Sequence, residues 1–202
     1  MRNLIRCATA TAFLFAAAAV ADVEKGLDAY DMGDYETAMA ECLPLAEDGN
    51  AEAQFCVGQM YANGFGVMMD DAAALKWYGL AATGGSSKAQ FQLGVMHANG
   101  WGVEMNDDQA AEYYRLAAEK GHSCAQRSLA YITSRGIGVE ENLQDAYMWY
   151  YVSAELGDNA SVAGRDEYAE KISAEQRMEA EAMAKKWLAK FEGGDLQAGR
   201  VD

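Results

Sequence analysis

The chain has 202 residues, of which 51% are apolar and only one is proline, and its net charge at pH 7 is −15. This composition excludes an intrinsically disordered chain, and the length suffices for one domain with a sizeable core. Because a strongly acidic protein repels nucleic acid and anionic lipid, we expect neither to be a ligand.

Residues 1–21 have the pattern of a secretory signal peptide. Arg2 and Arg6 form a basic start that precedes an uncharged apolar stretch, and Ala19-Val20-Ala21 supplies the small residues of a cleavage site. The apolar stretch is shorter than the roughly 20 residues that a membrane-spanning helix needs. Cleavage removes two of the 16 basic residues and leaves 14 against 31 acidic ones, a net charge of −17. We therefore expect a periplasmic or secreted protein without stable membrane insertion.

A repeat of 36 residues occupies most of the remaining chain. Three glycine-rich loops begin at Gly64, Gly100 and Gly136, each 36 residues after the one before. Three further series keep the same step: Gly49, Gly85, Gly121 and Gly157; Asp34, Asp70, Asn106 and Asn142; and Ala38, Ala74, Ala110 and Ala146. A fixed period in this range is typical of stacked helical units.

Each unit is predicted to be two helices joined by a glycine-rich loop. The series of Asp and Asn residues that begins at Asp34 supplies preferred N-cap residues, and each of them is predicted to start the second helix of its unit. Apolar residues follow at helical spacing, as in Ala74, Trp77, Tyr78 and Ala81. The series of glycines that begins at Gly49 is then predicted to end each second helix in a left-handed turn. In the first helix of the first unit, Gly58 would allow a close approach between helices.

These signals divide the chain into consecutive segments. We expect a signal peptide at 1–21, an N-terminal partial repeat at 22–49, full repeats at 50–85, 86–121 and 122–157, a C-terminal partial repeat with a capping helix at 158–192, and a tail at 193–202. The capping helix is predicted from the capping box Ser173 to Gln176. An apolar stripe follows, formed by Ala180, Ala184, Leu188 and Phe191.

The full units resemble Sel1-like repeats. The residues that carry the resemblance in the first unit are Ala53-Gln54-Phe55, Gly58, Met60-Tyr61, Gly64-x-Gly66-Val67, Trp77-Tyr78 and Gly85, and the pattern recurs from Ala89 and from Ala125. The chain departs from the family pattern at His97 and Thr133, where tyrosine is usual, and at Ala130 in place of glycine. The resemblance implies an all-α fold, a right-handed α-solenoid of stacked antiparallel helix pairs, and a non-enzymatic protein-interaction scaffold.

By analogy with tetratricopeptide repeats, the resemblance also implies that the first helices line a concave face that holds a protein or peptide partner. The residues predicted there are Phe55, Gln59, Asn63, Lys88, Phe91, Asn99, Arg127, Tyr131 and Arg135. Three of them are basic, so we expect a neutral or acidic partner segment anchored by Phe55, Phe91 and Tyr131. The alternative is a face that is merely solvated.

The cysteines and histidines carry further expectations. Cys42 and Cys56 each lie seven residues from Gly49, on opposite arms of a predicted antiparallel helix pair, and could form a disulfide or remain two buried thiols. His97 and His122 lack ligand spacing to each other or to a cysteine, so we predict no metal site. No cofactor is expected, because the glycine-rich loops lack the third glycine or lysine of a phosphate-binding fingerprint.

Two other functions stay open through the resemblance. Some exported relatives regulate a membrane sensor from the periplasmic side, and some cysteine-rich relatives are described as penicillin-binding or β-lactamase-like hydrolases. Against a hydrolase, no serine in this chain is followed by lysine three residues later, and neither H-E-x-x-H nor G-x-S-x-G occurs. We therefore predict an adaptor or assembly factor without catalytic residues.

Overall fold

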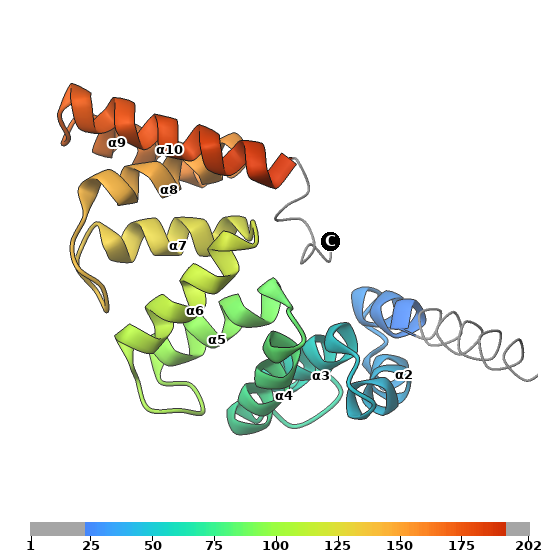
Figure 1. Ribbon diagram of the computed structural model, residues 1–202. Helices are drawn as coiled ribbons and strands as arrows, with labels where there is room; N and C mark the ends of the chain where they lie inside the picture. Colours follow the sequence, from blue (N-terminus) through green and yellow to red (C-terminus); the bar gives the residue numbers. More distant parts are fainter. Residues whose placement is uncertain (1–22, 193–202) are drawn as a thin grey trace, which may run out of the picture. The chain divides into compact units, whose positions relative to one another are not determined.

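The computed structural model describes residues 23–192, and within that range every regular element is a helix (Figure 1). The all-α fold class is confirmed. The signal peptide expected at 1–21 and the tail expected at 193–202 lie outside the described residues. The chain forms two compact units, which divide after Gly84.

The first unit is a stack of short helices. A helix covers residues 23–31 and is followed by α2 (Tyr35–Glu47), α3 (Ala51–Asn63) and α4 (Asp71–Thr83). The middle helix, α3, packs against both α2 and α4. The core therefore lies along α3, where Cys56, Val57 and Met60 are completely buried beside Ala38 and Cys42 of α2.

The second unit continues the same pairing of helices. Its elements are α5 (Ser87–Asn99), α6 (Asp107–Glu119), α7 (Ser123–Thr133), α8 (Leu143–Glu155), α9 (Asn159–Ala169) and α10 (Ala174–Glu192). From α5 to α9 each helix packs against the next one along the chain. The last helix, α10, packs against α8, beside which it runs in Figure 1.

The predicted starts and ends of the second helices are confirmed. The side chains of the four predicted cap residues accept hydrogen bonds from backbone N–H groups two or three residues further on; these residues are Asp34, Asp70, Asn106 and Asn142. Each second helix is followed by a glycine with φ between 87° and 97°, a conformation that residues with a Cβ rarely adopt.

A further series of caps, absent from the predicted pattern, starts the first helices. Their side chains also accept backbone N–H hydrogen bonds, and they lie 36 residues apart at Asn50, Ser86, His122 and Asp158. Each cap directly follows the glycine that ends the preceding helix. A three-residue connection, whose last two residues are this glycine and the cap, therefore ends one helix and starts the next.

Glycines in the first helices allow the helices of a pair to approach closely, as predicted for Gly58. A Cβ added there would lie 2.7 Å from the ring of Tyr78 in α4, and one added at Gly94 would lie 2.6 Å from the ring of Tyr114 in α6. Real Cβ atoms are essentially never found at such distances, so each ring packs directly on a glycine backbone.

The capping helix is also confirmed. Ser173 and Gln176 form a reciprocal capping box, in which the Ser173 N–H donates to Gln176 Oε1 at 2.9 Å and the Gln176 N–H donates to Ser173 Oγ at 3.1 Å. Ala180 and Ala184 are completely buried, and Phe191 lies directly against Gly121. The α10 helix thus covers apolar surface of the third repeat.

Candidate partner-binding groove

A groove of about 620 Å³ lies on the second unit, lined mainly by α7 and α9. We call it the α7–α9 groove. Its lining residues are Arg127, Ser128, Tyr131 and Ile132 from α7, Ala160, Gly164 and Glu167 from α9, and Ala98, Asp107, Tyr114, Ile137 and Tyr150 from neighbouring segments. Of these two helices, α7 carries predicted partner residues, whereas α9 belongs to the C-terminal partial repeat, where none was predicted.

Small residues form one part of the groove, and a single exposed ring forms another. Ser128, Ala160 and Gly164 present little side-chain bulk, and the ring of Tyr150 packs directly behind Gly164, where an added Cβ would lie 2.6 Å away. Tyr131 is 46% exposed, and the Arg135 guanidinium lies 4.7 Å from the centre of its ring. This cation–π contact holds an aromatic side chain at the solvent edge of the groove.

Arg127 is occupied by an ion pair within the protein. Its Nη1 donates to both carboxylate oxygens of Asp158 at 2.8 Å, and the two side chains are 37% and 13% exposed. The same carboxylate accepts hydrogen bonds from Ser153, at 3.2 Å, and Ser161, at 2.9 Å. Arg127 therefore joins α7 to the start of α9, and its charge is largely neutralised.

The charge of the groove consequently differs from the expectation of basic lining residues. Asp107 and Glu167 are exposed carboxylates in the lining, while the guanidinium of Arg127 is already paired. Glu167 also forms an exposed ion pair with Lys171, a type of contact that contributes little. Burial raises the pKa of both Tyr114 and Tyr150 to about 12, so these two rings stay neutral.

Of the predicted partner residues in the second unit, Arg127 and Tyr131 line the groove. Phe91 has another role, because its ring stacks on that of His122 at 4.7 Å and lies 5.8 Å from that of Tyr114. Asn99 donates from Nδ2 to the backbone carbonyl of its own helix at Val95, at 2.7 Å. Lys88 is half-buried near His122, and Arg135 contacts Tyr131 at the rim.

The remaining predicted partner residues belong to the first unit, whereas the groove is built from the second unit alone. Phe55 is half-buried, with its ring 5.6 Å from that of Tyr78. Asn63 donates from Nδ2 to the carbonyl of Gln59 at 2.8 Å, a contact within α3. The structure therefore gives Phe55 a packing contact and Asn63 a hydrogen bond at the end of α3.

One groove residue that the prediction missed follows from the repeat itself, because Glu167 lies 36 residues after the predicted Tyr131. Extending the period by one more step, into the C-terminal partial repeat, would have found it. Gly164 lies 36 residues after Ser128, which was not predicted either. The α9 helix therefore lines the candidate groove in addition to belonging to the C-terminal partial repeat.

The described residues contain few features of other kinds of site. Between residues 23 and 192, no three His, Cys, Asp or Glu side chains gather closely enough to hold a metal ion. No helix in that range combines the length and the apolar character needed to cross a membrane. Cys42, Cys56 and Cys124 are free thiols.

These features define a helical repeat protein with a surface groove on its first helices. The family model for the Sel1 repeat matches residues 51–86, 87–122 and 125–158, so the chain belongs to the Sel1 repeat family. Proteins built from this repeat generally mediate protein–protein interactions, and the repeat is typically a non-enzymatic scaffold.

Two solved structures illustrate the relationship. A Sel1 repeat protein from Oxalobacter formigenes is 36% identical over 71% of this chain, with a TM-score of 0.68. A protective antigen present in uropathogenic Escherichia coli strains, which displays an SLR fold, is 30% identical over 81% of this chain, with a TM-score of 0.71. The chain spans 59% and 35% of the lengths of those two proteins. A comparison with curated proteins finds no match.

Proposed function

We propose that this protein is a non-enzymatic adaptor that works outside the cytoplasm and holds a segment of a partner protein in the α7–α9 groove. The observation that carries the proposal is the exposed ring of Tyr131 beside the small residues Ser128, Ala160 and Gly164. A peptide backbone can lie close to such small residues while one of its side chains packs on the ring. Aromatic residues are frequent anchors of protein interfaces.

The lining also indicates the chemistry of the segment. Asp107 and Glu167 would attract a lysine or arginine, whereas the guanidinium of Arg127 is already paired with Asp158. The partner segment is therefore extended, has an apolar or aromatic side chain for Tyr131, and has a neutral or basic character.

Export rests on the N-terminal sequence pattern. The basic start, the short apolar stretch and the small residues before Asp22 are those of a cleaved signal peptide. Fractionation of producing cells, followed by N-terminal sequencing of the protein, tests this part separately. We expect a mature protein that begins at Asp22 outside the cytoplasm. An uncleaved protein in the cytoplasm would refute export but would not bear on partner binding by the groove.

Affinity capture from the exported fraction, read by mass spectrometry, tests the groove. Tyr131→Ala removes the ring and Ala160→Trp fills the space next to it, so both should reduce recovery of the same partner at least severalfold. Met178→Ala is the matched control, because Met178 is 72% exposed on α10 and lies outside the lining. Equal recovery of every partner by all three variants and the wild type would refute the groove assignment.

A further inference from the structure

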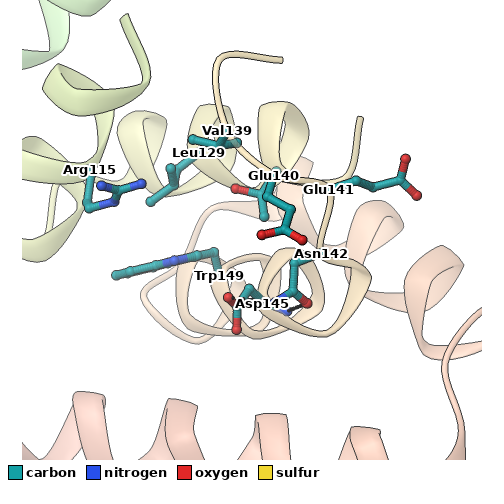
Figure 2. Close-up of a pocket in the computed structure, with 9 residues that line it drawn as sticks. Arg115, Leu129, Val139, Glu140, Glu141, Asn142, Asp145 and Trp149 are labelled. Carbon is teal, nitrogen blue, oxygen red and sulfur yellow. Dashed lines mark hydrogen bonds between the residues drawn. The ribbon is translucent and has the colours of Figure 1, made fainter. Parts of the chain in front are cut away.

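The second unit carries another cavity, which shares no lining residue with the α7–α9 groove. It measures about 350 Å³ and lies among α6, α7, α8 and the loop before α8 (Figure 2). Its lining residues are Arg115, Leu129, Thr133, Val139, Glu140, Glu141, Asn142, Asp145 and Trp149. This volume lies near the lower end of the roughly 300–1,000 Å³ that small-molecule sites occupy, so the cavity suits a small compound.

The cavity arises where the third repeat departs from the second. Thr133 and Trp149 lie 36 residues after His97 and Tyr113. In the second repeat the rings of His97 and Tyr113 stack, with centres 5.4 Å apart and planes 23° from parallel. Thr133 has no ring to place against Trp149, so the corresponding space stays open.

Arg115 is a second departure, since Gly79 stands 36 residues before it. Figure 2 shows its guanidinium at one side of the cavity, above the level of the Trp149 ring. The carboxylate of Glu112 is 3.9 Å from this guanidinium, which is longer than a hydrogen bond. Arg115 thus has N–H donors available, in the planar arrangement that binds a carboxylate through two hydrogen bonds.

Carboxylates stand at the other side. In Figure 2 the side chain of Glu140 reaches toward Asp145, whereas that of Glu141 points away. Asn142 donates from Nδ2 to Asp145 Oδ2 at 2.9 Å, which fixes one carboxylate oxygen and leaves the other to accept from a ligand. A ligand with only a negative charge would be repelled by these carboxylates, and a ligand with only a positive charge would be repelled by Arg115. The lining is therefore complementary to a compound that carries one positive and one negative group.

Apolar side chains complete the cavity between the charged groups. Leu129 is almost completely buried, and Val139 is half-buried. The indole of Trp149 packs edge-to-face on that of Trp187, with centres 5.9 Å apart, so its orientation is held by α10. These three side chains provide a wall for an apolar substituent.

We propose that this cavity binds a free α-amino acid with an apolar side chain. The ligand's carboxylate lies at Arg115, its ammonium group at Glu140 and Asp145, and its side chain against Trp149 and Leu129. This binding is separate from the proposed adaptor function, because the two sites have no lining residue in common.

Isothermal titration calorimetry on the whole mature protein tests the proposal. The amino-acid probes are L-leucine, L-valine and L-phenylalanine. Two analogues of leucine each lack one charged group: 4-methylpentanoate lacks the ammonium group, and isoamylamine lacks the carboxylate. We expect L-leucine, L-valine or L-phenylalanine to bind with one site per chain, and loss of either charged group from leucine to weaken binding about tenfold or more. Failure of all three amino acids to bind, or equal binding by the single-charge probes, would overturn the proposal.

Variants locate the bound amino acid. Arg115→Met and Glu140→Gln should each weaken binding about tenfold. Glu104→Gln is the matched control, because Glu104 is exposed at the equivalent position 36 residues earlier and lies outside the lining, and it should leave binding within about twofold. Thr133→Tyr restores the family's usual ring and should abolish binding while the protein keeps its helical circular dichroism. If Thr133→Tyr does not fold, the two charge variants decide. Unchanged binding in both of them would place the amino acid elsewhere and refute the site.

Discussion

The thiols of Cys42 and Cys56 interact in the buried core of the first unit, where α2 packs against α3. Both side chains are completely buried. The interaction of the two thiols lowers the pKa of Cys42 and raises that of Cys56. The two thiols face one another, as their equal spacing from Gly49 suggested, and both are free in the structure. The disulfide between them stays a prediction.

We predict that Cys42 and Cys56 become a disulfide when the chain folds in an oxidising compartment. The bond would close a loop of 15 residues (56 − 42 + 1), for which the expected stabilisation is on the order of 3 kcal/mol. Alkylation in denaturant before and after reduction, followed by mass spectrometry of protein from the exported fraction, measures the bond. Cys124 is the internal control and should be alkylated in both samples. Full alkylation of Cys42 and Cys56 before reduction would contradict the prediction.

Much of the fold could be predicted because its signals are local. An N-cap at Asp34 or a left-handed glycine at Gly49 satisfies backbone groups within a few residues, so a fixed residue type recurs at each step. The caps of the first helices were hidden because four different residue types fill that position, including His122, whose ring nitrogen Nδ1 accepts from the Ala125 N–H at 3.2 Å.

The candidate site was only partly predictable, because aromatic character alone does not distinguish a packed ring from an exposed one. Phe91 and Tyr131 were both proposed as anchors, yet they occupy different positions of the repeat. Phe91 lies 36 residues before Arg127, and its ring packs inward on His122. Tyr131 comes about one helical turn after Arg127 and stays exposed. Only the packing of neighbouring helices separates these two outcomes.

Gly58→Ala should destabilise the first unit by about 1–3 kcal/mol, because the new methyl group would overlap the ring of Tyr78. Gly79→Ala is the matched control in α4, where an added Cβ meets nothing within 4 Å. A helix-interior alanine costs less backbone entropy than glycine, so the control should be stabilised by about 0.5–1 kcal/mol. Urea denaturation monitored by circular dichroism measures both. Shifts in the same direction would refute the close approach at Gly58.

Asp158 joins three parts of the second unit, since it caps α9, pairs with Arg127 and accepts from Ser153 and Ser161. Asp158→Ala should therefore lower the free energy of unfolding by about 3 kcal/mol. A double-mutant cycle with Arg127→Met should give a coupling energy of about 1–2 kcal/mol. Asp166→Ala breaks an exposed ion pair with Arg165 and should change stability by less than about 0.5 kcal/mol. Additive effects of the Asp158 and Arg127 changes would disprove the coupling.

His122 should make the second unit less stable in mild acid. Burial, together with the nearby charge of Lys88, lowers its pKa to about 4 from the value of about 6.5 expected in the unfolded chain. Between these two pH values the unfolded chain binds a proton that the folded protein excludes, so the free energy of unfolding decreases as the pH falls from about 6.5 to 4. The decrease from this group is at most about 3 kcal/mol, and its contribution is constant above that window.

The variant His122→Asn isolates this effect, because asparagine can cap α7 through its side-chain oxygen but does not titrate. A Trp77→Phe background leaves only the tryptophans of the second unit as fluorescence reporters, namely Trp101, Trp149 and Trp187. Urea midpoints from pH 7.5 down to about 4.5 should fall less steeply in His122→Asn than in the parent, since carboxylate titrations common to both proteins cancel in the difference. Equal slopes would mean that His122 takes up its proton at similar pH in the folded and unfolded chains.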